Sequence, residues 1–129
     1  MCKMENNILL LVIICYVIIG FSHLLQPQAW INFFKLLIKK EQPGAFINGF
    51  ITLPVGVLIV TFHNVWTGTG MMLTIIGWCY ILKAMICFCL PQLCLKSMRR
   101  VETNNINEFR MGGGILLLVA AILSIPFFH

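Results

Sequence analysis

The chain has 129 residues, of which 60% are hydrophobic and only 10% are charged, whereas soluble domains carry roughly 25% charged residues. This composition excludes an ordinary soluble fold, and a mean hydropathy of +0.94 excludes an intrinsically disordered chain. The formal net charge is +5. Because the cations lie beside apolar segments, we expect lipid headgroups as the acidic partner and no binding to nucleic acid.

Four apolar segments are each long enough to cross a bilayer, which takes about 20 helical residues. In chain order they cover residues 8–25, 46–63, 71–90 and 109–128. The sequence therefore predicts an all-α integral membrane four-helix bundle that forms a single membrane domain over residues 1–129.

Lys and Arg residues concentrate in two of the connections between these spans. By the positive-inside rule, connections rich in Lys and Arg face the cytoplasm. The loops 26–45 and 91–108 are therefore predicted to be cytoplasmic, and both termini are predicted to lie outside a multi-pass protein of the cell (inner) membrane. The cations on the basic side are Lys35, Lys39, Lys40, Lys96, Arg99, Arg100 and Arg110, against Lys3 alone on the other side.

An aromatic and basic stretch follows the first span, between Pro27 and Pro43. Aromatic residues interleave with lysines in a pattern that is typical of a short helix lying in the membrane interface. An ordinary positive-inside loop with an aromatic belt is the alternative interpretation. The residues of this predicted interfacial helix are Trp30, Phe33, Phe34, Lys35, Lys39 and Lys40.

The two halves of the chain resemble each other. An offset of 64 aligns Cys15-Tyr16 with Cys79-Tyr80 and Pro27-Gln28 with Pro91-Gln92. Each half contains two spans and returns the chain to its starting side, as expected of parallel repeats. We therefore predict two tandem repeats, 1–64 and 65–129, whose equivalent tyrosines Tyr16 and Tyr80 lie on an interior stripe.

Lys83 lies well inside the third span, where a charge is costly, and no Asp or Glu lies within the spans to neutralise it. One interpretation is that its long side chain extends to the headgroups. The other is that Lys83 borders a polar cavity that holds an anionic lipid headgroup or a small anion. The residues expected at this cavity are His23, Asn48, Lys83, Cys87, Glu108 and Arg110.

Four of the six cysteines, Cys15, Cys79, Cys87 and Cys89, lie inside apolar runs, where we expect reduced, structural side chains. Cys87 and Cys89 point to opposite sides of a helix, and no C-x-x-C pair is present, so no metal is expected. No catalytic motif is found. We expect no cofactor and no enzymatic activity.

The segment Gly20-Phe21-Ser22-His23-Leu24-Leu25-Gln26-Pro27 resembles the G-x-x-H-F-x-x-P signature of DoxX-like four-helix membrane proteins. The second half, with Pro91, a basic loop and Phe109-Arg110-Met111-Gly112 opening a helix, is similar to short YjeT-type proteins of unknown function. The first resemblance implies a small bacterial inner-membrane protein, sometimes an accessory subunit of a membrane oxidoreductase. That family often carries an acidic residue in its second span, where this chain has Thr52 and Pro54.

Two functions are compatible with these features. The first is a non-catalytic accessory or scaffold subunit, within a homo-oligomer or a larger membrane complex. The alternative is a small oligomeric transporter or an anion- or lipid-binding protein with a polar interior around Lys83. A membrane redox enzyme that uses the cysteines of the third span is the least expected function.

Overall fold

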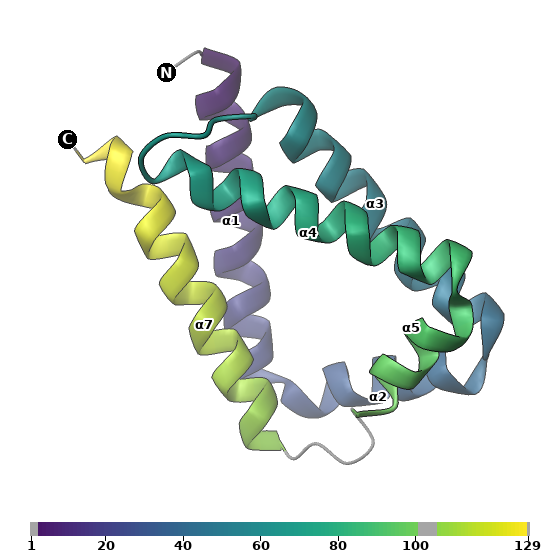
Figure 1. Ribbon diagram of the computed structural model, residues 1–129. Helices are drawn as coiled ribbons and strands as arrows, with labels where there is room; N and C mark the ends of the chain where they lie inside the picture. The colour runs from purple at the N-terminus through teal and green to yellow at the C-terminus, as the bar shows by residue number, and fades with distance from the viewer. Residues whose placement is uncertain (1–2, 101–105, 129) are drawn as a thin grey trace.

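The computed structural model describes residues 3–100 and 106–128, and all regular elements in these ranges are helical (Figure 1). Four helices are long and apolar enough to cross a membrane. The all-α, multi-pass architecture predicted from the sequence is therefore confirmed. The long helices are α1 (Lys3–Leu25), α3 (Gln42–Phe62), α4 (Gly70–Cys89) and α7 (Ile106–Ser124), the last followed by the 3-10 turn η1 (Ile125–Phe127).

Two short helices, α2 (Pro27–Lys39) and α5 (Pro91–Met98), each begin with a proline. Proline lacks the N–H that the first helical turn leaves unbonded, so it starts a helix without loss of a hydrogen bond. A helix was predicted in the first of these loops, whereas none was predicted for α5. Pro43 acts in the same way at the start of α3, which begins four residues before the predicted span 46–63.

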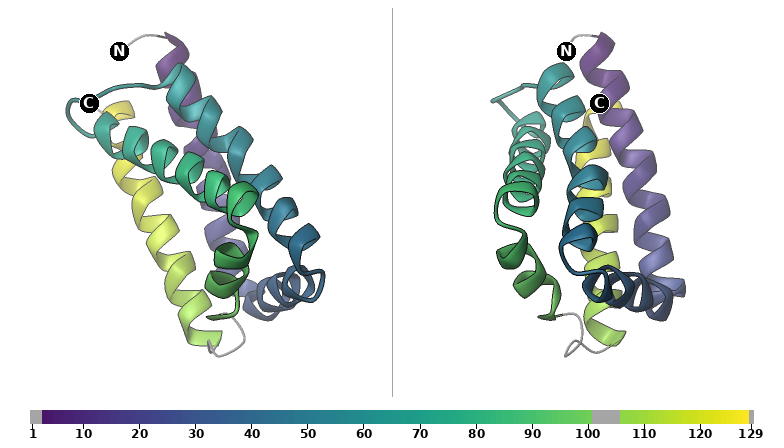
Figure 2. Two further views of the ribbon diagram at one scale, coloured as in Figure 1. Left: turned by 45° about the vertical axis from the view of Figure 1, so that its right-hand side comes forward. Right: turned by 90° about the vertical axis from the view of Figure 1, so that its right-hand side faces the viewer.

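The long helices form two antiparallel pairs, in which α1 packs against α7 and α3 packs against α4 (Figure 2). Glycines permit both close crossings. A Cβ atom on Gly113 would lie 2.7 Å from the Gly20 carbonyl oxygen, and one on Gly77 would lie 2.6 Å from Cγ2 of Ile59. A larger side chain at either glycine would separate the paired helices.

The bundle has two chemically different ends. The two termini and the α3–α4 connection lie at one end, which we call the termini end, whereas α2 and α5 lie at the other, the basic end (Figure 1). This arrangement has the relative sidedness predicted from the sequence. That the basic end faces the cytoplasm stays a prediction.

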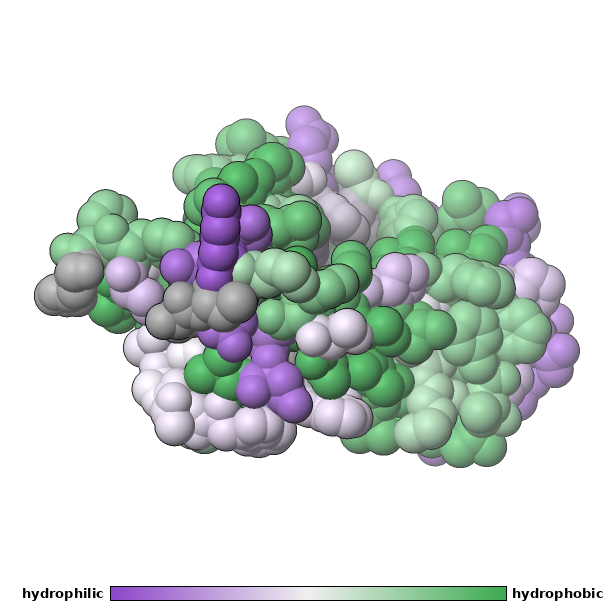
Figure 3. All heavy atoms as spheres, turned by 90° about the horizontal axis from the view of Figure 1, so that it is seen from above, coloured by the Kyte–Doolittle hydropathy of each residue, from purple (hydrophilic) through white to green (hydrophobic). Residues whose placement is uncertain are grey.

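Buried side chains form two clusters. The larger one includes Leu9, Tyr16, Ile59, Leu73 and Leu123 and draws on all four long helices. The smaller one, at the basic end, joins α2, α3, α4 and α5 through residues such as Leu37, Ala45 and Leu95. Outward-facing side chains are largely apolar, and Figure 3, seen from the termini end, shows apolar side chains over most of the visible surface with polar ones in patches. Such a surface suits contact with lipid.

Candidate functional site

A pocket of about 960 Å³ opens at the basic end, where α5 folds back beside α4. Its wall is formed mainly by α4 and α5, and Phe34 of α2 and Asn48 of α3 complete it. We call it the basic-end pocket. Its size falls within the range of small-molecule sites.

Cations dominate the polar part of the pocket wall. Lys83 projects from α4, while Lys96, Arg99 and Arg100 follow along and just beyond α5. None of the described residues that line the pocket is an Asp or a Glu. Lys83 is exposed to the open pocket and forms no ion pair with a described residue. Lys83, Lys96 and Arg99 therefore give the pocket a positive charge that the described part of its wall does not neutralise.

The remainder of the wall is apolar. Phe34, Leu82, Ile86 and Leu93 lie on it, contributed by α2, α4 and α5. An apolar wall beside a cluster of cations matches a molecule with an anionic head and a hydrocarbon tail.

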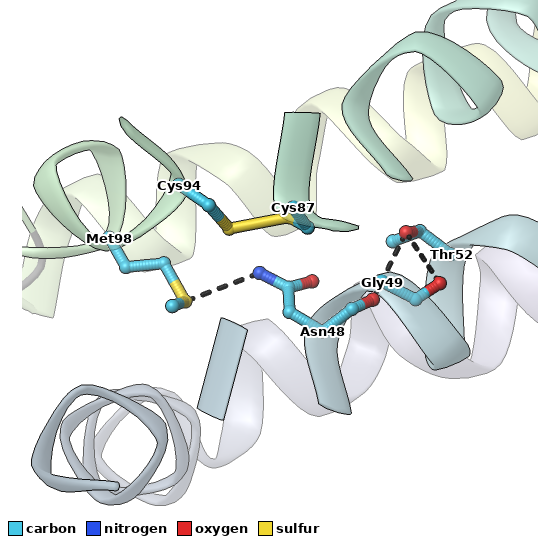
Figure 4. Close-up of a disulfide and its surroundings, with 6 residues drawn as sticks. All are labelled: Asn48, Gly49, Thr52, Cys87, Cys94 and Met98. Carbon is cyan, nitrogen blue, oxygen red and sulfur yellow. Dashed lines mark hydrogen bonds between the residues drawn. A yellow bond between two sulfur atoms is a disulfide. The ribbon is translucent and has the colours of Figure 1, made fainter. Parts of the chain in front are cut away.

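A disulfide between Cys87 and Cys94 joins α4 to α5 on this wall, with the two Cα atoms 5.0 Å apart (Figure 4). The expectation that Cys87 is a reduced cysteine is therefore wrong. Hydropathy places Cys87 inside an apolar run, but Pro91 begins a new helix that returns the chain across the end of α4. This turn brings Cys94 against Cys87. Cys15, Cys79 and Cys89 have free thiols.

Asn48 forms the buried polar part of the pocket. Its side-chain N–H donates to Sδ of Met98 over 3.2 Å (Figure 4). The Thr52 hydroxyl donates to the Asn48 carbonyl oxygen at 3.0 Å, one turn away on α3. Because Met98 lies on α5, the first of these bonds and the disulfide hold α5 against the bundle from two sides.

The structure brings together only part of the predicted polar cluster. Asn48, Lys83 and Cys87 line one pocket, whereas His23, Glu108 and Arg110 do not line it. The cause is the helix pairing: α1 packs against α7, and α4 packs against α3. The α1 and α7 members of the predicted cluster are thereby carried away from Lys83.

His23 belongs to an aromatic stack instead. Its ring lies 4.3 Å from that of Trp30 and 6.0 Å from that of Phe109, centre to centre and nearly parallel to both. Nδ1 of His23 lies 2.9 Å from the Ile19 carbonyl oxygen. The ring therefore fastens α2 and α7 to α1.

The aromatic residues of α2 face the bundle more than the bilayer. Trp30 and Phe34 are half-buried, and Nε1 of Trp30 donates to the Ser22 hydroxyl over 2.8 Å. Phe33 packs edge-on against both rings. The lysines of this helix, Lys35, Lys39 and Lys40, are exposed.

Tyr16 and Tyr80 meet inside the bundle, with their hydroxyl oxygens 2.9 Å apart. Tyr16 is only 6% exposed. The polar stripe does not continue inward along α4, because Cys79 and Lys83 are exposed. These two residues line the pocket instead, although both lie within one helical turn of Tyr80.

The pocket wall includes one cysteine and three cations that were not predicted as site residues: Cys94, Lys96, Arg99 and Arg100. The sequence carried one usable signal for them. Cys87 and Cys94 flank Pro91 at a spacing of seven residues, and a helix–proline–helix turn brings such positions together. In the described residues no group of three or more His, Cys, Asp or Glu side chains is placed to hold a metal ion.

Comparison of the chain with protein-family models, curated proteins and solved structures yields no match. The resemblance to DoxX-like and YjeT-type proteins therefore stays a prediction.

Proposed function

We propose that this multi-pass membrane protein binds an anionic lipid in the basic-end pocket. One observation carries the proposal: Lys83, Lys96 and Arg99 line the same cavity of about 960 Å³ as an apolar wall, and no described lining residue supplies a carboxylate. Each Lys or Arg near an anionic membrane surface contributes about 1 kcal/mol to lipid attraction. Of the functions expected from the sequence, lipid binding is the one that this geometry supports best.

The apolar wall favours a lipid over a small free anion. Leu82 and Leu93 are about half exposed, at 54% and 50%, so a bound hydrocarbon chain could cover them. Lys83 lies inside the apolar span α4, whereas Lys96 lies on the short helix α5 and Arg99 follows it. A headgroup between these cations would place its acyl chains along α4, in the direction of the bilayer core.

Transport is less well supported by the packing. A conducting path through the interior of a single bundle would have to pass Tyr16 and Tyr80, whose hydroxyls are in contact. Leu73 and Leu123, both 0% exposed, fill the bundle beyond this pair. The pocket is therefore better suited to holding a ligand than to passing one through.

The test uses protein reconstituted in nanodiscs that contain equal amounts of phosphatidylglycerol and phosphatidylcholine, followed by native mass spectrometry. We expect phosphatidylglycerol to be retained in preference to phosphatidylcholine. The double variant Lys96→Gln/Arg99→Gln should lose this preference about tenfold, since it removes two cations from the wall. The control Lys35→Gln/Lys39→Gln removes the same charge from the same end of the molecule, outside the pocket, and should keep the preference.

Equal retention of the two lipids by the unaltered protein would contradict the proposal. If protein extracted directly from its own membrane instead carries a second polypeptide and no preferred lipid, the accessory-subunit function would be favoured.

We also infer that the chain consists of two parallel repeats, 1–64 and 65–129. In both halves a long helix is followed by a proline-initiated short helix, α2 in the first and α5 in the second. In this alignment α1 corresponds to α4 and α3 corresponds to α7, so the α1–α7 pair is equivalent to the α4–α3 pair. Tyr16 and Tyr80, equivalent at the offset of 64, contact each other as residues near a twofold axis do.

A further inference from the structure

We propose that the Cys87–Cys94 disulfide is a thiol–disulfide exchange site whose reductant is an anionic low-molecular-weight thiol. The inference goes beyond lipid binding, and it rests on the position of the two sulfur-bearing residues among the cations of the basic-end pocket.

Access to the disulfide is through the pocket. Cys87 and Cys94 are 1% and 5% exposed, so neither presents its sulfur on the outer surface. Both nevertheless line the cavity. We therefore infer that a thiol attacks the disulfide from within the cavity, at Cys94, which is the more exposed of the two residues.

The charge of the pocket selects the kind of thiol that enters. Lys83, Lys96 and Arg99 line the cavity with the two cysteines. A cleft lined by charges of one sign raises the local concentration of ions of the opposite sign by about tenfold or more. A thiol that carries carboxylates is therefore concentrated there, whereas a cationic thiol is repelled.

Reduction of the disulfide takes place in two successive thiol–disulfide exchanges. The attacking thiolate forms a bond to the sulfur of Cys94, the Cys87–Cys94 bond breaks, and its electron pair leaves as the Cys87 thiolate. Lys83 lies one helical turn before Cys87 on α4, at the i, i+4 spacing, and a nearby cation stabilises a thiolate. A second equivalent of thiol then attacks the small-molecule sulfur of the mixed disulfide. This attack releases the Cys94 thiolate and the oxidised small-molecule disulfide.

The predicted orientation gives this exchange a biological setting. With the basic end in the cytoplasm, the disulfide faces a compartment in which structural disulfides are rare and most disulfides are transient. Reduction would remove the covalent tie between α4 and α5 and leave α5 held by the Asn48–Met98 hydrogen bond and by the packing of Leu95 and Met98 in the smaller buried cluster.

The experiment measures reduction rates in a background in which the other four cysteines, Cys2, Cys15, Cys79 and Cys89, are replaced by serine. Glutathione (anionic), 2-mercaptoethanol (neutral) and cysteamine (cationic) are compared at equal thiolate concentration, with gel shifts by a maleimide polymer as the readout. The same protein unfolded in urea with an uncharged detergent supplies the intrinsic reactivity of each thiol. Relative to that reference, we expect the folded protein to favour glutathione over cysteamine by about tenfold or more.

Two variants locate the effect. Lys96→Gln/Arg99→Gln should bring the glutathione preference close to that of the unfolded reference, while Lys35→Gln/Lys39→Gln should retain it. Labelling of both cysteines before any reductant is added would overturn the inference. So would a preference in the folded protein equal to that of the unfolded reference, or one that both double variants lower equally.

Discussion

The two ends of this bundle differ in whether charged side chains line a cavity. At the termini end, the buried Thr74 side chain bonds to nearby protein groups: its hydroxyl donates to the Val65 carbonyl oxygen at 2.7 Å and accepts from the Val65 N–H at 3.0 Å. At the basic end, Lys83, Lys96 and Arg99 line an open cavity and form no ion pair with a described carboxylate. The first end is closed by its own hydrogen bonds, and the second leaves charge for a ligand to neutralise.

His63 illustrates the closed end. The side chain is 0% exposed, and its Nε2 donates to the Gly70 carbonyl oxygen over 3.2 Å. The Thr74 hydroxyl lies 3.1 Å from the His63 carbonyl oxygen, so both residues are buried beside the α3–α4 connection. We therefore expect stability to depend mainly on the termini end and the helix crossings, and the proposed lipid binding to depend on the basic end. Mutations can separate the two.

The largest expected effect is at the crossing of α1 and α7. Gly113→Val would place a Cβ 2.7 Å from the Gly20 carbonyl oxygen, a backbone atom that cannot move aside without shifting α1. We expect a loss of about 3 kcal/mol in the free energy of unfolding, measured by SDS titration in mixed micelles. The matched control is Gly114→Val, one residue along, where a Cβ meets nothing within 4 Å. Equal losses for the two variants would contradict the close crossing.

A leucine at each end tests the comparison directly. Leu73→Ala empties a site that is 0% exposed and should lower the free energy of unfolding by about 2 kcal/mol. Leu93→Ala, in the pocket wall and 50% exposed, should change it by less than about 0.5 kcal/mol. The same SDS titration measures both losses. A larger loss of unfolding free energy for Leu93→Ala than for Leu73→Ala would contradict the roles assigned to the two ends.

Removal of the Thr74 hydroxyl should have a smaller effect. Thr74→Val keeps the shape of the side chain but leaves the buried groups of the α3–α4 connection without their partner. We expect a loss of about 1 to 2 kcal/mol. Thr67→Val, at an exposed position in the same connection, should be nearly neutral. Neutral behaviour of Thr74→Val would show that the termini end does not depend on these hydrogen bonds.

The smallest effect is expected at the tyrosine pair. Tyr16→Phe and Tyr80→Phe each remove one hydroxyl from the shared bond and should cost about 0.6 kcal/mol. Because both break the same bond, the double variant should cost little more than either single one. Additive losses in this double-mutant cycle would contradict the contact that supports the two-repeat inference.

Much of the fold could be predicted from hydropathy and charge. Four apolar segments of membrane length and the loop lysines identified the long helices and the basic end. Helix pairing could not be predicted in this way, since it depends on positions such as Gly20 and Gly113, where backbones approach closely. Hydropathy treats these positions like any other small residue.

The candidate site was predicted only in part for the same reason. Lys83 stood out as a charge in an apolar span, and Asn48 and Cys87, which were grouped with it, line the same pocket. His23 was grouped with them by depth alone, which says nothing about which side of the bundle a residue occupies. Cys94 was missed because its contact with Cys87 depends on the turn at Pro91.

We propose that the basic-end pocket holds an anionic lipid, and photo-crosslinking can locate the lipid on the protein. A phosphatidylglycerol analogue with a photoreactive acyl chain is compared with its phosphatidylcholine counterpart in the same membranes, and labelled residues are mapped by mass spectrometry. We expect the anionic probe to label the pocket wall around Leu82 and Leu93 selectively, and unlabelled phosphatidylglycerol to compete. Equal labelling by both probes, spread over the outer faces of α1 and α7, would contradict the claim.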